Sequence, residues 1–342
     1  MNSPDILSPK RSHAKSHAAK AELAEIAAPV VREMDAFNAE FRRAMISDVP
    51  VVNLVAKYII RTKGKQVRPM LVLLAAKACG EVGEPTYRAA TLVELLHTAT
   101  LVHDDVIDES DERRGLPSIR ALWKNKIGVL MGDYLLAQGL LRTVATGEYN
   151  FLEITSRAVR RMSEGELYQL QKSRQMNTNE ADYFRIIADK TASLLATCTE
   201  LGAASVASPH QIALRDYGEA VGIAFQIRDD LFAFDPSLGT IGKPATTDFK
   251  DKKLTLPILH ALAKAKNDEK KHVLSLIKSG KAATKAYGEV LAFVEQYGGT
   301  EYATKKAFEY SESAKSAISI LPDSDAKHAL EQFADYVVER VK

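Results

Sequence analysis

The sequence has few features of a secreted, membrane-spanning or nucleic-acid-binding protein. Its two cysteines, Cys79 and Cys198, lie in alanine-rich stretches of a 342-residue chain, so we expect two free thiols rather than a disulfide scaffold. No apolar run approaches the roughly 18 residues that cross a bilayer. The formal net charge is only +2, which gives no basis for binding nucleic acid. These absences predict a cytoplasmic globular protein without a transmembrane segment.

Alternating strand patterns joined by turns are also absent, whereas apolar residues recur at spacings of three and four almost throughout. This spacing predicts helices. The clearest are Lys20–Met45, Val52–Arg61, Val67–Cys79, Pro85–Asp108, Ile127–Ala145, Leu152–Lys172, Glu180–Glu200, Pro209–Phe234 and Thr255–Leu262. No linker divides them, so we predict a single all-α domain of ten or more helices over residues 21–342. Residues 1–20 lack the apolar segment of a signal peptide and are expected to be disordered.

The most informative stretch contains Asp104, Asp105 and Asp108, followed closely by Arg113 and Arg114. Residues four apart lie almost above one another on a helix, so we expect these carboxylates to share about one third of its surface. Such a cluster repels itself unless a cation lies between its members. Mg²⁺ prefers one or two carboxylates together with phosphate oxygens and water. In its apolar surroundings, the cluster therefore predicts a magnesium-diphosphate site in a cavity.

A second acid pair, Asp229 and Asp230, lies in another apolar helical stretch. Other motifs accompany the two clusters in a defined order: Gly64-Lys65-Gln66-Val67-Arg68-Pro69, His97 to His103, Gly132-Asp133, Glu164-Gly165-Glu166, Lys190-Thr191-Ala192, Gly222 with Phe225-Gln226, Gly242-Lys243, and Lys253 to Pro257. From about Gly64 to the C-terminus, the sequence resembles the trans-isoprenyl diphosphate synthase family, most closely its bacterial long-chain, octaprenyl-type members.

The resemblance implies an isoprenoid-synthase fold, with mostly antiparallel helices around a deep central cavity, and a homodimer. It also implies a prenyltransferase that condenses isopentenyl diphosphate head to tail with an allylic diphosphate primer, using two or three Mg²⁺ ions. Loss of diphosphate from the primer leaves an allylic cation, which the double bond of isopentenyl diphosphate attacks. A lipid-like product further suggests a transient membrane contact during its release.

The resemblance also assigns roles to individual residues. The implied metal ligands are Asp104, Asp105, Asp108, Asp229 and Asp230. Residues expected to contact the allylic diphosphate or to place its leaving group are Arg113, Lys190, Gln226 and Lys243. The residues matching the isopentenyl diphosphate pocket are Lys65, Arg68, His97 and Arg114. Without the resemblance, His97 is equally explained as a core histidine, and Lys65 and Arg68 as a solvated helix start. Glu164 and Glu166 are expected to be structural.

The sequence departs from the family pattern at two places. Ala233 stands where relatives carry the last aspartate of the second cluster, and Asp235 lies about 120° away around a helix, so it is a poor replacement. Gln66 stands where relatives often carry arginine. Ala99, five residues before Asp104, is small where short-chain enzymes often carry a bulky aromatic residue, and Thr100 is also small. By the resemblance, these two residues predict a long product of heptaprenyl to octaprenyl length, a quinone side-chain precursor.

Three alternatives remain open from the sequence. A terpene cyclase or head-to-head synthase shares the metal chemistry, although the Gly-Lys-x-x-Arg-Pro motif and the paired arginines indicate a site for a second diphosphate. A non-catalytic, regulatory subunit of a prenyl synthase would explain Ala233, but it has no need for the intact first cluster. A shorter-chain, geranylgeranyl-type synthase would share every motif except the small residues before that cluster.

Overall fold

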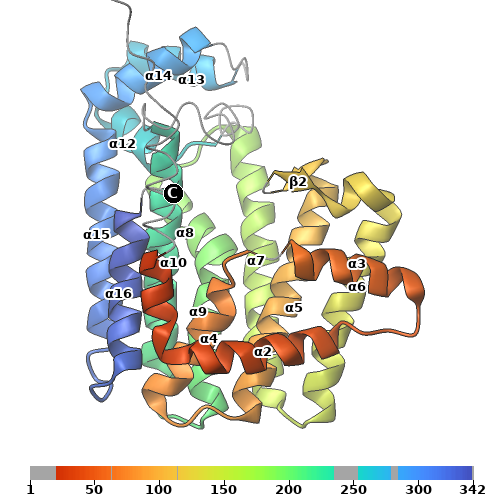
Figure 1. Ribbon diagram of the computed structural model, residues 1–342. Helices are drawn as coiled ribbons and strands as arrows, with labels where there is room; N and C mark the ends of the chain where they lie inside the picture. Colours follow the sequence, from red (N-terminus) through yellow and green to blue (C-terminus); the bar gives the residue numbers. More distant parts are fainter. Residues whose placement is uncertain (1–20, 63, 114, 235–252, 279–283, 341–342) are drawn as a thin grey trace, which may run out of the picture.

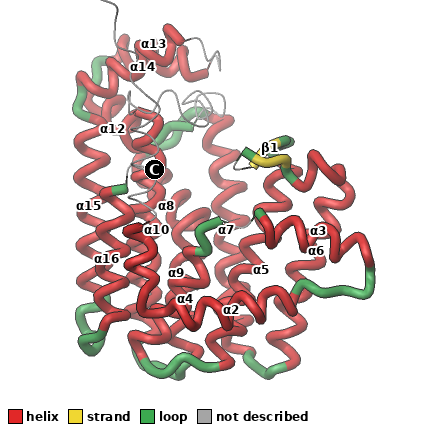
Figure 2. The backbone as a smooth tube through the Cα atoms, in the orientation of Figure 1, coloured by secondary structure: helices red, strands yellow, loops and turns green. Residues whose placement is uncertain are grey.

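The computed structural model describes residues 21–62, 64–113, 115–234, 253–278 and 284–340. Helices make up almost all of this part of the chain (Figures 1 and 2). They are α2 (Val31–Ala44), α3 (Pro50–Arg61), α4 (Val67–Cys79), α5 (Glu84–Ile107), α6 (Ile119–Ala145), α7 (Tyr149–Gln175), α8 (Glu180–Ile187), α9 (Ser193–Ser205), α10 (Gln211–Leu231), α12 (Leu256–Lys264), α13 (Asn267–Lys278), α14 (Thr284–Gln296), α15 (Gly299–Ala317) and α16 (Asp325–Glu339). The predicted all-α fold is confirmed. The prediction for residues 1–20 lies outside the described residues.

The core is a succession of packed helices that runs from α6 through α5, α4, α9 and α10 to α15. Helices α4 and α9 are apolar around most of their circumference, as expected for helices in the middle of a bundle. They pack very closely at Gly202 of α9, where a Cβ atom would lie only 2.7 Å from the Cβ of Ala75. This close packing fixes the inner helices against which α5 and α10, the two helices with acid clusters, are placed.

Three predicted helices are interrupted in the structure. Residues 21–27 are separated from α2 by a 3₁₀ segment, Ala28–Val30, because Pro29 has no N–H to continue the helix. The predicted helix Glu180–Glu200 is divided into α8 and α9 by a π-helical turn, Ala188–Ala192, which we call the π-turn. The predicted helix Pro209–Phe234 ends as α10 at Leu231, followed by a 3₁₀ segment, Phe232–Phe234. Periodicity alone does not distinguish these variants from an α-helix.

A small hairpin follows α5 and carries one of the predicted arginines. Strands β1 (Glu112–Arg113) and β2 (Leu116–Pro117) pair antiparallel, and Gly115 adopts a positive φ of 74° in the turn. Two-residue strands are too short to show an alternating pattern, so they cannot be predicted from the sequence pattern. Tyr58 of α3 holds the hairpin by donating a 2.6 Å hydrogen bond to the Pro117 carbonyl. Arg113 is therefore held beside the end of α5.

None of the helices within the described ranges combines the length and apolar character needed to cross a membrane.

Candidate active site

The three carboxylates of the first acid cluster point away from α5 in two different directions. Asp105 is buried, with 3% of its surface exposed, and accepts a 2.8 Å hydrogen bond from Nε of Arg113. Asp104 and Asp108 remain exposed to solvent. Successive residues on a helix are 100° apart, whereas residues four apart differ by only 40°, so Asp104 and Asp108 share a direction that Asp105 does not. The expectation that all three carboxylates point together is therefore corrected for Asp105.

Asp104 points toward charges on other helices. Desolvation raises the pKa of its carboxyl group, and repulsion from Asp108 raises it further, while the positive charge of Lys190 opposes both effects. Glu166 of α7 adds a smaller repulsion. A carboxylate pair with this unfavourable self-interaction is suited to binding a cation.

A cavity of about 670 Å³ borders α5 at Asp105 and is also lined by Leu195 of α9 and Phe225 of α10. Four of the predicted substrate-binding residues line it: Lys65, Arg68, His97 and Arg113. They come from the segment before α4, the first turn of α4, the middle of α5 and strand β1. Arg68 Nη1 lies 3.0 Å from His97 Nε2, and Lys65 Nζ lies 3.4 Å from the Tyr336 hydroxyl. We call this the cation-lined cavity.

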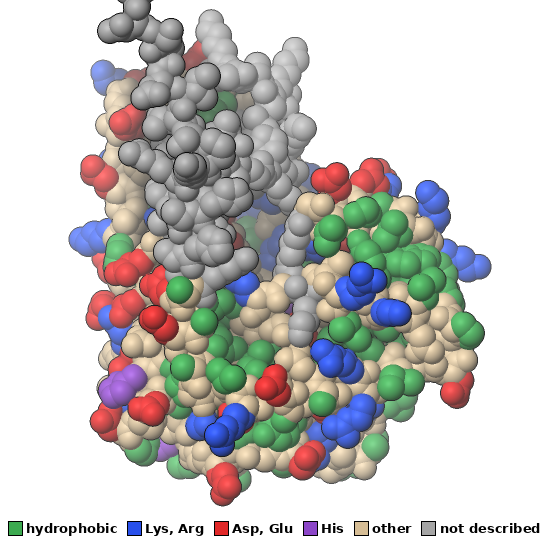
Figure 3. All heavy atoms as spheres, viewed as in Figure 1, with side chains coloured by type: hydrophobic (Ala, Val, Ile, Leu, Met, Phe, Trp, Pro, Cys, Tyr) green, Lys and Arg blue, Asp and Glu red, His purple; other side chains and the backbone are tan. Residues whose placement is uncertain are grey.

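Three of the four residues predicted for the isopentenyl diphosphate pocket, Lys65, Arg68 and His97, line the cation-lined cavity. Arg114 lies outside the described residues. Arg113 was expected beside the allylic diphosphate, whereas it lines the cation-lined cavity and pairs with Asp105. Gln66 also lines the cavity and donates a 3.1 Å hydrogen bond to Asn38. Figure 3 shows a hollow near the middle of this face of the molecule, with basic side chains inside it.

Arg340, which follows α16, is a site residue that sequence reasoning missed. Its guanidinium lies 4.0 Å from the ring centre of Phe225 and forms a short ion pair with Asp229. It also lines the cation-lined cavity, although it is far in sequence from the predicted substrate-binding residues there. One arginine in an amphipathic C-terminal helix gives no sequence signal of this role. Asp229 is thus engaged by an arginine in this structure.

The other member of the second acid pair faces a smaller cavity of about 270 Å³. Asp230 accepts hydrogen bonds from the Tyr183 hydroxyl at 2.8 Å and from Gln226 Nε2 at 2.9 Å. The Gln226 side-chain oxygen in turn accepts a 2.9 Å hydrogen bond from Thr191 on the π-turn. The predicted residues Lys190, Gln226 and Asp230 are therefore brought together, whereas Lys243 lies outside the described residues.

Lys190 extends from the π-turn and pairs with Glu166 Oε2 at 2.5 Å. Glu166 was expected to be structural, but it contacts a predicted site residue. Lys253 also lines the smaller cavity, although its sequence motif predicts no role for it. Two lysines in this cavity give it the charge needed to bind a phosphate group.

The donor groups suit a metal ion that is bound together with its substrate. Among the described residues, no three aspartate, glutamate, histidine or cysteine side chains converge into a ready-made metal site. Mg²⁺ commonly takes only one or two protein carboxylates and completes its shell with phosphate oxygens and water. Asp104 with Asp108, and the Asp229–Asp230 pair, fit this limited role. Ala233 offers only its backbone carbonyl, which accepts a hydrogen bond from Tyr287.

The two predicted chain-length residues lie outside both cavities. Ala99 is 3% exposed and belongs to the apolar core, whereas Thr100 is half-buried and donates a 2.8 Å hydrogen bond to the His97 carbonyl. Neither lines the cation-lined cavity or the smaller one. Their proposed effect on product length therefore concerns a path through the apolar interior.

Comparisons with known proteins show the family to which the chain is similar. The profile of the polyprenyl synthetase family matches residues 49–294. An all-trans-nonaprenyl-diphosphate synthase (geranyl-diphosphate specific) from Rhodobacter capsulatus is 35% identical over 93% of this chain and 98% of its own. A short chain isoprenyl diphosphate synthase from Methanothermobacter thermautotrophicus is 33% identical over 91% of this chain and 98% of its own. The crystal structure of a Caulobacter crescentus polyprenyl synthase complexed with calcium and isoprenyl diphosphate superposes with a TM-score of 0.84, at 34% identity over 93% of this chain and 97% of the other.

Proposed function

Because the chain belongs to the polyprenyl synthetase family, we propose that it makes a long-chain, all-trans polyprenyl diphosphate, of heptaprenyl to octaprenyl length. The coarser activity follows from the family: the protein is a prenyltransferase of the trans-prenyl diphosphate synthase class. The observation that carries the proposed two-substrate reaction is the division of the first acid cluster between two directions on α5, and the small residues Ala99 and Thr100 support the long product. Asp104 and Asp108 serve one diphosphate, and the cation-lined cavity beside Asp105 serves the other.

In the proposed reaction, the allylic diphosphate binds between Asp104 and the second acid pair. Bound Mg²⁺ would neutralise the diphosphate as it leaves, with Asp104, Asp108, Asp229 and Asp230 as its protein ligands. Lys190 and Lys253 line the neighbouring cavity and would contact the same phosphate oxygens. Fixed positive charges in a site with little water are effective at stabilising such developing charge.

Isopentenyl diphosphate would bind in the cation-lined cavity through Lys65, Arg68 and His97. The C–O bond of the allylic substrate breaks, and its electron pair leaves with the diphosphate. The double bond of isopentenyl diphosphate then forms the new C–C bond, and a proton leaves the adjacent carbon for the departed diphosphate. The cation-lined cavity also reaches Phe225 of α10 and Arg340, which pairs with Asp229, so the two substrates would meet between α5 and α10.

Incubating the purified chain with Mg²⁺, isopentenyl diphosphate and farnesyl or geranylgeranyl diphosphate tests this proposal. Mass spectrometry after phosphatase treatment should show a series of polyprenols that ends at one long product. EDTA should abolish the series, because the leaving group then lacks its counter-ions. A series ending at geranylgeranyl would contradict the long-chain proposal, and no elongation would contradict the proposed activity as a whole.

Ala99 provides a second test of product length. Ala99→Phe should shorten the product by at least one isoprene unit, because a bulky ring replaces a methyl group in the apolar interior beneath Asp104. Ala39→Phe, on an exposed position of α2, is the matched control and should leave the product unchanged. Overpacking typically costs about 1–3 kcal/mol, so thermal unfolding should accompany the product analysis. A folded A99F enzyme with wild-type product length would place the limiting residue elsewhere.

We also propose that the chain forms a homodimer through α6. This helix exposes six large apolar side chains, Leu122, Val129, Leu130, Leu140, Leu141 and Val144. Exposed apolar surface on one helix is typical of an interface, and a two-fold axis would place the same face of a second copy against it. Sedimentation at the mass of one chain at micromolar concentration would contradict this proposal.

A further inference from the structure

The π-turn that carries Lys190 and Thr191 is enclosed by two neighbouring helices. At Gly165 of α7, a Cβ atom would lie 2.9 Å from the Cβ of Asp189 and 3.0 Å from the backbone nitrogen of Lys190. At Gly222 of α10, a Cβ atom would lie 2.6 Å from the Cβ of Ala192. Both helices therefore contact the turn where they carry no side chain. Single π-turns within α-helices are often found at functional sites.

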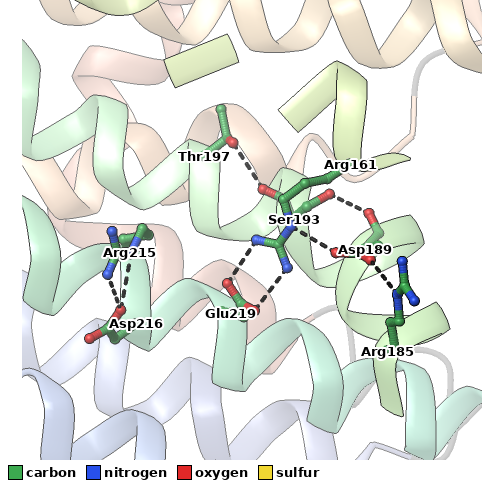
Figure 4. Close-up of polar contacts among 8 residues, drawn as sticks. All are labelled: Arg161, Arg185, Asp189, Ser193, Thr197, Arg215, Asp216 and Glu219. Atoms are coloured by element: carbon green, nitrogen blue, oxygen red, sulfur yellow. Dashed lines mark hydrogen bonds and ion pairs between the residues drawn. The ribbon is translucent and has the colours of Figure 1, made fainter. Parts of the chain in front are cut away.

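One arginine joins the π-turn to both of these helices (Figure 4). Arg161 of α7 donates from Nε to Asp189 Oδ1 at 2.8 Å, and from Nη1 and Nη2 to the two carboxylate oxygens of Glu219 on α10, at 3.0 and 2.9 Å. The planar guanidinium suits such a forked contact, which lysine cannot reproduce. The hydrogen bonds to Glu219 raise the pKa of Arg161, and those to Asp189 add to this effect. The arginine therefore stays charged.

The same face of α7 continues toward the proposed site. Gly165 lies one turn after Arg161. Glu166 follows Gly165 directly, and Gln169 lies one further turn along α7. Glu166 holds Lys190 at 2.5 Å, and Gln169 lies 3.5 Å from the same amine. Asp189 and Lys190 are consecutive in the π-turn. Because Arg161 fixes Asp189 in position, the Lys190 side chain is directed toward Asp104 and the smaller cavity.

We propose that Arg161 is a positioning residue: by joining Asp189 to Glu219, it fixes the π-turn so that Lys190 and Thr191 reach the departing diphosphate. This inference rests on the proposed function. Arg161 does not itself line either cavity. Its effect should therefore appear in the allylic half-site and not in the binding of isopentenyl diphosphate, whose proposed residues Lys65, Arg68 and His97 line the cation-lined cavity.

Arg161→Gln tests the inference, with Arg157→Gln as the matched control. Arg157 lies one turn earlier on α7 and pairs with Glu200 of α9 at 2.6 Å, but it does not contact the π-turn. We expect R161Q to lower kcat between about 10-fold and 100-fold and to raise KM for the allylic diphosphate, because small displacements of a charged group reduce catalysis strongly. KM for isopentenyl diphosphate should not change. R157Q should keep the wild-type kcat even if its unfolding temperature falls as much as that of R161Q.

Arg161→Lys keeps the positive charge but loses the forked contact with Glu219, so its kcat should lie between those of the wild type and R161Q. Its unfolding temperature should be close to that of the wild type. If R161Q does not fold, R161K carries the test through its kcat and its two KM values. Equal kcat in wild type, R161Q and R157Q would overturn the inference alone, and so would equal changes in both KM values. A wild-type chain that forms no product would instead overturn the proposed function.

Discussion

Asp104→Asn should slow chain elongation by about a thousandfold, the loss expected when a preorganised electrostatic contact to a leaving group is removed. The substitution preserves the shape of the side chain and removes its charge. In the structure, the Asp104 carboxylate is repelled by Asp108 and attracted by the charge of Lys190. Removing one carboxylate should therefore also raise the Mg²⁺ concentration needed for half-maximal rate. Steady-state rates measured over a range of Mg²⁺ concentrations give both quantities.

Two further variants make this prediction specific. Asp105→Asn removes a carboxylate from the adjacent position, but Asp105 is buried against Arg113, so its main effect should be a higher KM for isopentenyl diphosphate. Asp216→Asn, in an exposed ion pair with Arg215 on α10, should leave every constant unchanged. Equal Mg²⁺ dependence in D104N and D105N would show that the two carboxylates act together after all.

Arg68→Gln should raise KM for isopentenyl diphosphate between about 10-fold and 100-fold, the cost of losing a charge-assisted contact to a phosphate group. Arg68 lines the cation-lined cavity and lies 3.0 Å from His97. KM for the allylic diphosphate should stay the same, because the residues proposed for that substrate are Asp104, Lys190 and the second acid pair. Initial rates with each substrate varied in turn separate the two constants.

Arg61→Gln is the control for this prediction, because Arg61 is an exposed arginine at the end of α3 and lies outside the cation-lined cavity. It should behave as wild type. A change in the allylic KM as large as that for isopentenyl diphosphate would argue against two separate diphosphate sites on α5. That result would also weaken the central observation behind the proposed function.

Arg340 illustrates what the sequence could not supply. Its guanidinium reaches Asp229, which lies 111 positions earlier in the chain. Nothing near Arg340 in the sequence distinguishes it from a surface arginine. The contact depends on α16 packing beside α10 and α4, which is a property of the assembled bundle. Lys253 is similar: its motif was visible, but its position beside Lys190 required the fold.

The π-turn shows the same limit at shorter range. Residues Ala188–Ala192 have the spacing of an ordinary helix, and the sequence predicts one. The wider turn is selected by contacts with Gly165 and Gly222, and with Arg161 across to Glu219. These partners are on α7 and α10, so local propensity does not contain the information.

The sequence by itself determined the helical class and the two acid clusters, because the spacing of apolar residues and the clustering of charge are local properties of the chain. It also indicated the residues of the second diphosphate pocket, through motifs whose order resembles a family. The tertiary structure alone decided the direction of each carboxylate. It also decided that Arg340 contacts Asp229, and that Lys253 and the π-turn residue Lys190 line the same cavity. Direction and proximity between distant segments arise from helix packing, in which each side chain is placed by neighbours that lie far away in the sequence.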